Sequence, residues 1–121
     1  MASLKIQILL VLHDNYIYLV SHDRHAVVVD PAEAEPVMRE LKERELELDH
    51  ILVTHHHADH AGGVKKLQRK TNCAVWGPDD KRIPSLTNPL SDGEDIELLG
   101  ERWTAMAVPG HTSSAMAFHC F

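Results

Sequence analysis

One short segment, Thr54-His55-His56-His57-Ala58-Asp59-His60, constrains this chain more than any other. It follows the apolar run Ile51-Leu52-Val53 and precedes the pair Gly62-Gly63. Imidazole nitrogens and carboxylate oxygens are ligands of zinc, iron and manganese, and a divalent ion in a protein pocket takes three or four such groups. The segment therefore predicts a metal-binding loop at the end of a buried strand, with two glycines that let the backbone pass close to it.

The spacing within this segment favours an extended loop over a helix. Helical metal sites place two histidines four residues apart on one face, whereas His55 and His57 are two residues apart. Side chains two positions apart on extended backbone point to the same side. We therefore expect His55 and His57 to point one way, with Asp59 and His60 closing the other side. A solvated histidine-rich loop is the alternative, and the flanking strand and glycine pair disfavour it.

A second histidine-bearing turn, Pro109-Gly110-His111-Thr112, lies far along the chain at the end of an expected strand over residues 102–108. A histidine on such a turn is more typical of a placed ligand than of a core residue. The first segment also lacks a distant partner that would complete a set of three histidines. We predict that His111 is this partner.

The remaining pattern predicts one small α/β domain for the 121 residues. Expected antiparallel strands at 4–12, 16–20 and 26–29 precede a helix at 33–45, a strand at 51–53 and a second helix at 64–70. The order strand, helix, strand implies a crossover that places the histidine segment at the carboxyl end of a strand. Further strands are expected at 74–76, 94–98, 102–108 and 115–121, with a loop over 77–88.

Several residues outside the two histidine turns have open or minor roles. Asp30 ends the third strand, where its carboxylate either faces a site or caps a turn, and we expect a supporting residue rather than a ligand. The scattered His13, His22, His25 and His50 are expected at the surface or in turns. The basic group Lys65, Lys66, Arg69 and Lys70 either attracts an anionic substrate or forms a solvated helix face that suits the helix dipole.

Composition narrows the class of protein. The formal charge of -6 weighs against nucleic acid as a partner. Cys73 and Cys120 are too few for a disulfide scaffold and indicate free thiols in a reducing compartment. The apolar run at residues 6–12 is too short for a membrane span and lacks a cleavage site. We expect no membrane partner and a cytoplasmic location, with a mitochondrial one left open.

The H-x-H-x-D-H order of residues 55–60, followed by Gly62-Gly63 and the later Pro-Gly-His-Thr turn, resembles the metallo-β-lactamase fold superfamily. Within it the chain is most similar to the glyoxalase II (hydroxyacylglutathione hydrolase) group. Four segments carry this resemblance, at residues 14–18, 28–31, 54–63 and 108–112. The resemblance implies an αββα sandwich, represented here by its N-terminal half, a mixed β-sheet with two helices.

The resemblance also implies ligand roles. His55, His57 and His111 would hold one zinc ion, and Asp59 and His60 a second, with iron or manganese as alternatives. In the family a bridging Asp, a further His and a helical glutathione-binding region follow the stretch that ends here at Phe121. We therefore expect residues 1–121 to form a single, truncated domain whose second metal site is partial. Ser113-Ser114-Ala115 departs from the family, which commonly has a Gly-His pair there.

The implied reaction is hydrolysis of a small glutathione thioester such as S-lactoylglutathione. A metal held by three histidines lowers the pKa of bound water toward neutrality, and the resulting hydroxide can attack the thioester carbonyl. A thiolate leaves without a strong general acid, and no G-x-S-x-G motif supplies another nucleophile. Asp59 is the candidate catalytic residue, because it would orient the water as well as bind metal.

Other functions remain alternatives. The chain could be a truncated, inactive metal-binding isoform, or the same fold could perform sulfur dioxygenase, lactamase or nuclease chemistry. The acidic net charge disfavours the nuclease. The sequence predicts neither the substrate-binding residues nor the oligomeric state.

Overall fold

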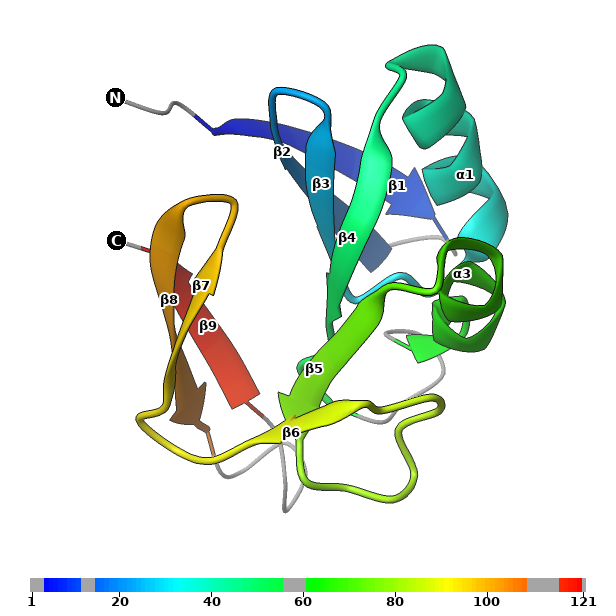
Figure 1. Cartoon of the computed structure of the whole chain (residues 1–121). Coiled ribbons are helices and arrows are strands. Elements are labelled where there is room, and N and C mark those ends of the chain that lie inside the picture. Colours follow the sequence, from blue (N-terminus) through cyan, green and yellow to red (C-terminus); the bar gives the residue numbers. More distant parts are fainter. Residues whose placement is uncertain (1–3, 12–14, 56–60, 109–115, 121) are drawn as a thin grey trace.

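The computed structural model describes residues 4–11, 15–55, 61–108 and 116–120. Within these ranges two helices and nine strands form two sheets and a helical layer (Figure 1). In chain order the elements are β1 (Lys5–Val11), β2 (Asn15–His22), β3 (His25–Val29), α1 (Ala34–Glu43), β4 (Glu47–Leu52), α3 (Val64–Thr71), β5 (Ala74–Pro78), β6 (Asn88–Leu90), β7 (Asp95–Leu98), β8 (Glu101–Ala107) and β9 (Met116–Cys120).

The larger sheet has six strands in the order β1-β2-β3-β4-β5-β6. The first three strands pair antiparallel, whereas β3, β4, β5 and β6 run parallel. Helix α1 connects β3 to β4, which confirms the predicted crossover. Because β3 and β4 are parallel, their carboxyl ends lie at one edge of the sheet, and the histidine segment begins at this edge.

Helices α1 and α3 cover one face of the larger sheet, and the small antiparallel sheet β7-β8-β9 lies against the other (Figure 1). The burial at the end of β4 explains why the run Ile51-Leu52-Val53 is continuously apolar. Ile51 and Val53 pack among the helices, whereas Leu52 packs against Trp103 of the small sheet, and the three residues of the run are fully buried. A strand covered on both faces has no solvated side on which polar residues would alternate.

The two helices form where their apolar spacing predicts them. Val37 and Leu41 of α1 are one helical turn apart and both are buried, as are Val64 and Leu67 of α3. Helix α3 ends at Asn72, which adopts the left-handed conformation (φ 56°) that stops a helix.

The predicted fold class is confirmed, and three details differ. Strand β6 begins at residue 88, inside the expected loop. Its Pro89 obscured the pattern, but proline is tolerated here because β6 is an edge strand. Strand β4 begins at Glu47 rather than at Ile51. His50 is neither a surface nor a turn residue: it is half-buried in β4, and its Nδ1 accepts a hydrogen bond from Trp76 Nε1 at 3.0 Å.

Other expectations on side chains are met. Cys73 is buried and Cys120 is half-buried, and both thiols are free. His22 and His25 flank the turn between β2 and β3, as expected for turn residues. In the described part of the chain, no helix combines the length and the apolar character that crossing a membrane would require.

Candidate metal centre

Of the predicted metal ligands, His55 lies within the described residues. His57, Asp59, His60 and His111 lie outside them. His55 follows the carboxyl end of β4 after two residues and has only 6% of its surface exposed. A buried imidazole at a strand end is a suitable fixed ligand, because its position is determined by the core rather than by a solvated loop.

Two preceding residues hold His55 in place. Thr54 donates its hydroxyl to Asp30 Oδ2 at 2.7 Å and its backbone N–H to Asp30 Oδ1 at 2.8 Å. The same hydroxyl oxygen lies 2.8 Å from His55 Nδ1. Because the single hydroxyl proton goes to the carboxylate, Nδ1 is the donor in this contact and Nε2 carries the lone pair. The imidazole is therefore oriented, and fixed in one tautomer, as metal-binding histidines require.

The contacts of Asp30 favour the expected supporting role. Asp30 is 7% exposed, and both of its carboxylate oxygens accept hydrogen bonds from Thr54. Its backbone N–H donates to Leu52 O at 2.8 Å, and its φ of 51° lies in the left-handed region. Aspartate accepts this conformation more readily than most residues do.

The small sheet approaches the same point. The backbone N–H of Met116, the first residue of β9, donates to Thr54 O at 2.8 Å. The predicted ligand His111 stands five positions before Met116 in the sequence. Strand β9, which follows His111 in the sequence, therefore begins beside the residue that precedes His55, and this position is compatible with the expected convergence of the two histidine turns.

A largely apolar hollow of about 380 Å³ lies between the two sheets beside this point. Its lining includes Tyr18 and Val29 from the large sheet and Trp103 and Phe118 from the small one, together with Thr54. Space next to the candidate centre is thus available for a group with apolar character.

Gly63 makes a close backbone contact within the described residues, whereas residues 56–60 of the expected metal loop lie outside them. It approaches residues 31–34, which follow β3, and its N–H donates to Pro31 O at 2.6 Å. A Cβ atom on Gly63 would lie 2.6 Å from the carbonyl carbon of Glu33 and 2.7 Å from Pro31 O. The absence of a side chain at Gly63 therefore allows the start of α3 to pack against the segment that follows Asp30.

The basic residues of α3 are all exposed. Lys66 pairs with Glu35 of α1, and this hydrogen bond lowers the pKa of the Glu35 carboxyl. The contact ties the two helices together at the surface. It favours the solvated-face interpretation of the basic group.

Comparison with known proteins identifies the family. The sequence profile of the metallo-beta-lactamase superfamily matches residues 11–121. The chain belongs to the metallo-beta-lactamase superfamily. Its sheet order and the two helices on one face are consistent with the N-terminal half of that fold.

The superfamily members most similar in sequence include two bacterial proteins. The hydroxyacylglutathione hydrolase of Aliivibrio fischeri (strain ATCC 700601 / ES114) is 48% identical over 108 residues, which are 88% of this chain and 43% of that protein. The hydroxyacylglutathione hydrolase of Aliivibrio salmonicida (strain LFI1238) is 50% identical with the same coverage. The chain thus spans less than half the length of these relatives.

Solved structures agree on the fold. ETHE1 from Myxococcus xanthus superimposes with a TM-score of 0.84 at 27% identity, over 96% of this chain and 53% of that one. The BLEG-1 B3 metallo-beta-lactamase gives a TM-score of 0.80 at 22% identity, over 98% of this chain and 67% of that one. The second likeness shows only the shared fold of this superfamily.

Sequence reasoning did not assign a role to Thr54. Its hydroxyl joins Asp30 to His55, which are 25 positions apart in the sequence. The sequence did contain a signal for this contact. Asp30 and Thr54 directly follow two strands that were expected to be parallel neighbours, so both residues were expected at the same edge of the sheet. Which atoms meet at that edge, however, depends on the register of β3 against β4.

Proposed function

We propose that this chain carries the metal-binding half of a hydrolase that cleaves small glutathione thioesters, in the manner of the hydroxyacylglutathione hydrolases to which it is similar. The observation that supports the proposal best is the Asp30–Thr54–His55 relay, which orients a buried imidazole at the carboxyl edge of the sheet. Such preorganisation is what a metal ligand needs and what a plain surface histidine lacks.

In this proposal His55, His57 and His111 hold one zinc ion, and Asp59 and His60 contribute to a second site. The donor chemistry of the set fits, since neutral imidazoles and a carboxylate are borderline ligands that zinc accepts. When bound, the ion supplies Lewis-acid activation of water and of the thioester carbonyl. Asp59 would accept a hydrogen bond from a water at this centre and orient it, and the hollow between the sheets would accommodate part of the substrate.

The test measures zinc content and S-lactoylglutathione hydrolysis with the purified chain and with His55→Ala and His111→Ala. We expect each substitution to abolish high-affinity zinc binding and any turnover, because a site with two of three histidines loses most of its affinity. His119→Ala is the matched control, since His119 is an exposed histidine on β9. Unchanged zinc stoichiometry in either site variant would falsify the metal assignment.

A second candidate function is metal binding without turnover. It needs only the ligand set and the orientation of His55 by Thr54, and no substrate contact. Stoichiometric zinc with no detectable thioester hydrolysis would support this candidate over the first. Bound iron with oxygen uptake would instead indicate different chemistry on the same fold.

A further inference from the structure

A second cluster of metal-ligating side chains lies at the opposite end of the large sheet. It contains His25 at the start of β3 and Glu47 and Asp49 near the start of β4. One ligand atom from each of the three lies within 4.8 Å of the others. Asp49 and Thr54 are five positions apart on nearly extended backbone, which corresponds to about 16 Å. The cluster is therefore separate from the candidate centre at His55.

The backbone register brings these three residues together. His25 and Glu47 are direct partners in the parallel pair of β3 and β4. The register then shifts, so that Ala26 pairs with Leu48 but Val27 pairs with His50. Asp49 is the extra residue of this bulge, and bulges redirect side chains in this way. Its Oδ2 atom lies 2.8 Å from His25 Nδ1.

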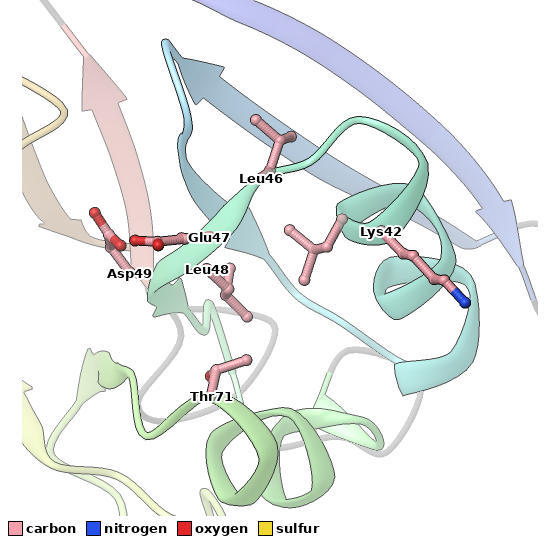
Figure 2. A pocket seen from close by; sticks show the side chains of 7 residues that line it. Lys42, Leu46, Glu47, Leu48, Asp49 and Thr71 are labelled. Carbon is pink, nitrogen blue, oxygen red and sulfur yellow. The ribbon is translucent and has the colours of Figure 1, made fainter.

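Figure 2 shows the two carboxylates beside one another, on the side of β4 away from α1. The pocket drawn there is a hollow of about 430 Å³ whose lining includes Glu47 and Asp49 as well as Leu48 and Thr71. Its Lys42 extends away from the carboxylates. Among the described residues, no lysine or arginine nitrogen lies within 4.0 Å of either carboxylate. A cation would therefore reduce the repulsion between Glu47 and Asp49.

The geometry is close to what a transition-metal ion requires. Nitrogen and oxygen ligands lie about 2.0–2.2 Å from zinc, so two ligands of a tetrahedral ion are about 3.3–3.6 Å apart. The three ligand atoms lie within 4.8 Å of one another, and rotation of the exposed Glu47 side chain can bring its carboxylate closer. One imidazole nitrogen and two carboxylate oxygens are ligands that zinc and similar first-row ions accept.

The surroundings leave room to complete the coordination. A hollow of about 330 Å³ adjoins the cluster and is lined by His22, His25, Asp49, Leu99 and Gly100. It lies where the β2–β3 turn meets the β7–β8 turn. Water molecules can occupy the remaining positions around an ion at this site.

We propose that His25, Glu47 and Asp49 form a peripheral binding site for a divalent transition-metal ion, with zinc as the reference ion. The site joins the β2–β3 hairpin to the start of β4. It is independent of the proposed hydrolase function, because it uses none of the ligands assigned to that centre. Its occupancy would stabilise the folded chain, since an unfolded chain does not hold the three ligands together.

Zinc titration of the ¹⁵N-labelled 121-residue chain, followed by amide chemical shifts, tests the proposal. We expect one set of shifts near Thr54 and His55 and a second set, with its own titration curve, at residues 24–26 and 47–50. His25→Ala should weaken the second set at least about tenfold and leave the first unchanged. Asp49→Asn, which keeps the shape of the side chain, should do the same.

His119→Ala serves as the control, because it removes an exposed histidine from the other sheet and should preserve both sets. Spectra without zinc establish that each variant is folded. The proposal is overturned if residues 24–26 and 47–50 do not respond to millimolar zinc, or if their titration is unchanged in His25→Ala and Asp49→Asn. If zinc shifts the amides of residues 24–26 and 47–50 but not those near Thr54 and His55 in the unsubstituted chain, the proposed hydrolase centre is refuted and this site is supported.

Discussion

The hydroxyl oxygen of Thr54 lies 2.7 Å from Asp30 Oδ2 and 2.8 Å from His55 Nδ1. One small side chain thus connects the ends of two parallel strands and determines which nitrogen of His55 faces the candidate centre. The backbone of Thr54 also accepts the hydrogen bond from Met116 that brings the small sheet to this point.

Thr54→Val should lower zinc affinity about 10- to 100-fold while leaving the fold intact. Valine matches the shape of threonine but cannot accept the Nδ1–H of His55 or donate to Asp30. Thr54→Ser retains the hydroxyl and should bind zinc nearly as tightly as the wild type. Competition with a chelator measures the affinities. Equal affinity in the valine variant and the wild type would show that the hydroxyl does not orient His55.

Asp30→Ala should reduce the free energy of unfolding by about 1–3 kcal/mol, because two Thr54 donors lose their charged acceptor. The φ of 51° at this position adds a penalty for alanine that glycine does not have. Asp30→Gly should therefore be more stable than Asp30→Ala by about 1 kcal/mol. Urea denaturation of the two variants checks the order, and the reverse order would contradict a native left-handed conformation.

Gly63→Ala should destabilise the protein by about 1–3 kcal/mol, because the new Cβ would overlap the backbone of residues 31–34. Gly100→Ala is an informative control. Gly100 has open space but a φ of 75°, so alanine there meets conformational strain of about 1 kcal/mol and no steric overlap. Thermal denaturation compares the two. Similar small losses of stability in both variants would mean that the contact between Gly63 and residues 31–34 is less tight than the structure indicates.

His50 should make the folded state less stable in acid. Burial lowers the pKa of His50 from its usual 6.5, an effect partly offset by Asp49. As pH falls below about 6.5, His50 therefore takes up a proton in the unfolded chain before it does so in the folded chain. The stability contributed by the neutral imidazole is lost as pH falls through the pKa of His50 in the folded state.

His50→Gln removes this titration and leaves an amide oxygen that can accept the Trp76 hydrogen bond. The variant should lose less stability than the wild type between pH 7.5 and pH 5, as measured by urea midpoints at each pH. Parallel stability curves for the two proteins would argue against a buried, neutral His50.

The pattern of apolar and polar residues was sufficient to predict the helices and strands that bury one distinct face. The spacing of Val37 and Leu41 predicted α1, and the continuous run at Ile51-Leu52-Val53 predicted a strand covered on both sides. It was insufficient for β6, where Pro89 is tolerated only because the strand lies at an edge. It also placed His50 wrongly, because a polar residue beside Asp49 resembles a turn unless its partner Trp76 is known.

The sequence by itself determined the family and predicted a metal site, because the ligand types and their spacing around residues 55–60 and at His111 are local properties of the chain. Only the tertiary structure decided how Asp30 and Thr54 support His55, and that His25 meets Glu47 and Asp49. The contacts of Asp30 with Thr54, and of His25 with Glu47 and Asp49, join residues more than 20 positions apart. They follow from strand register and from one bulge, which are set by the packing of whole strands rather than by any short segment.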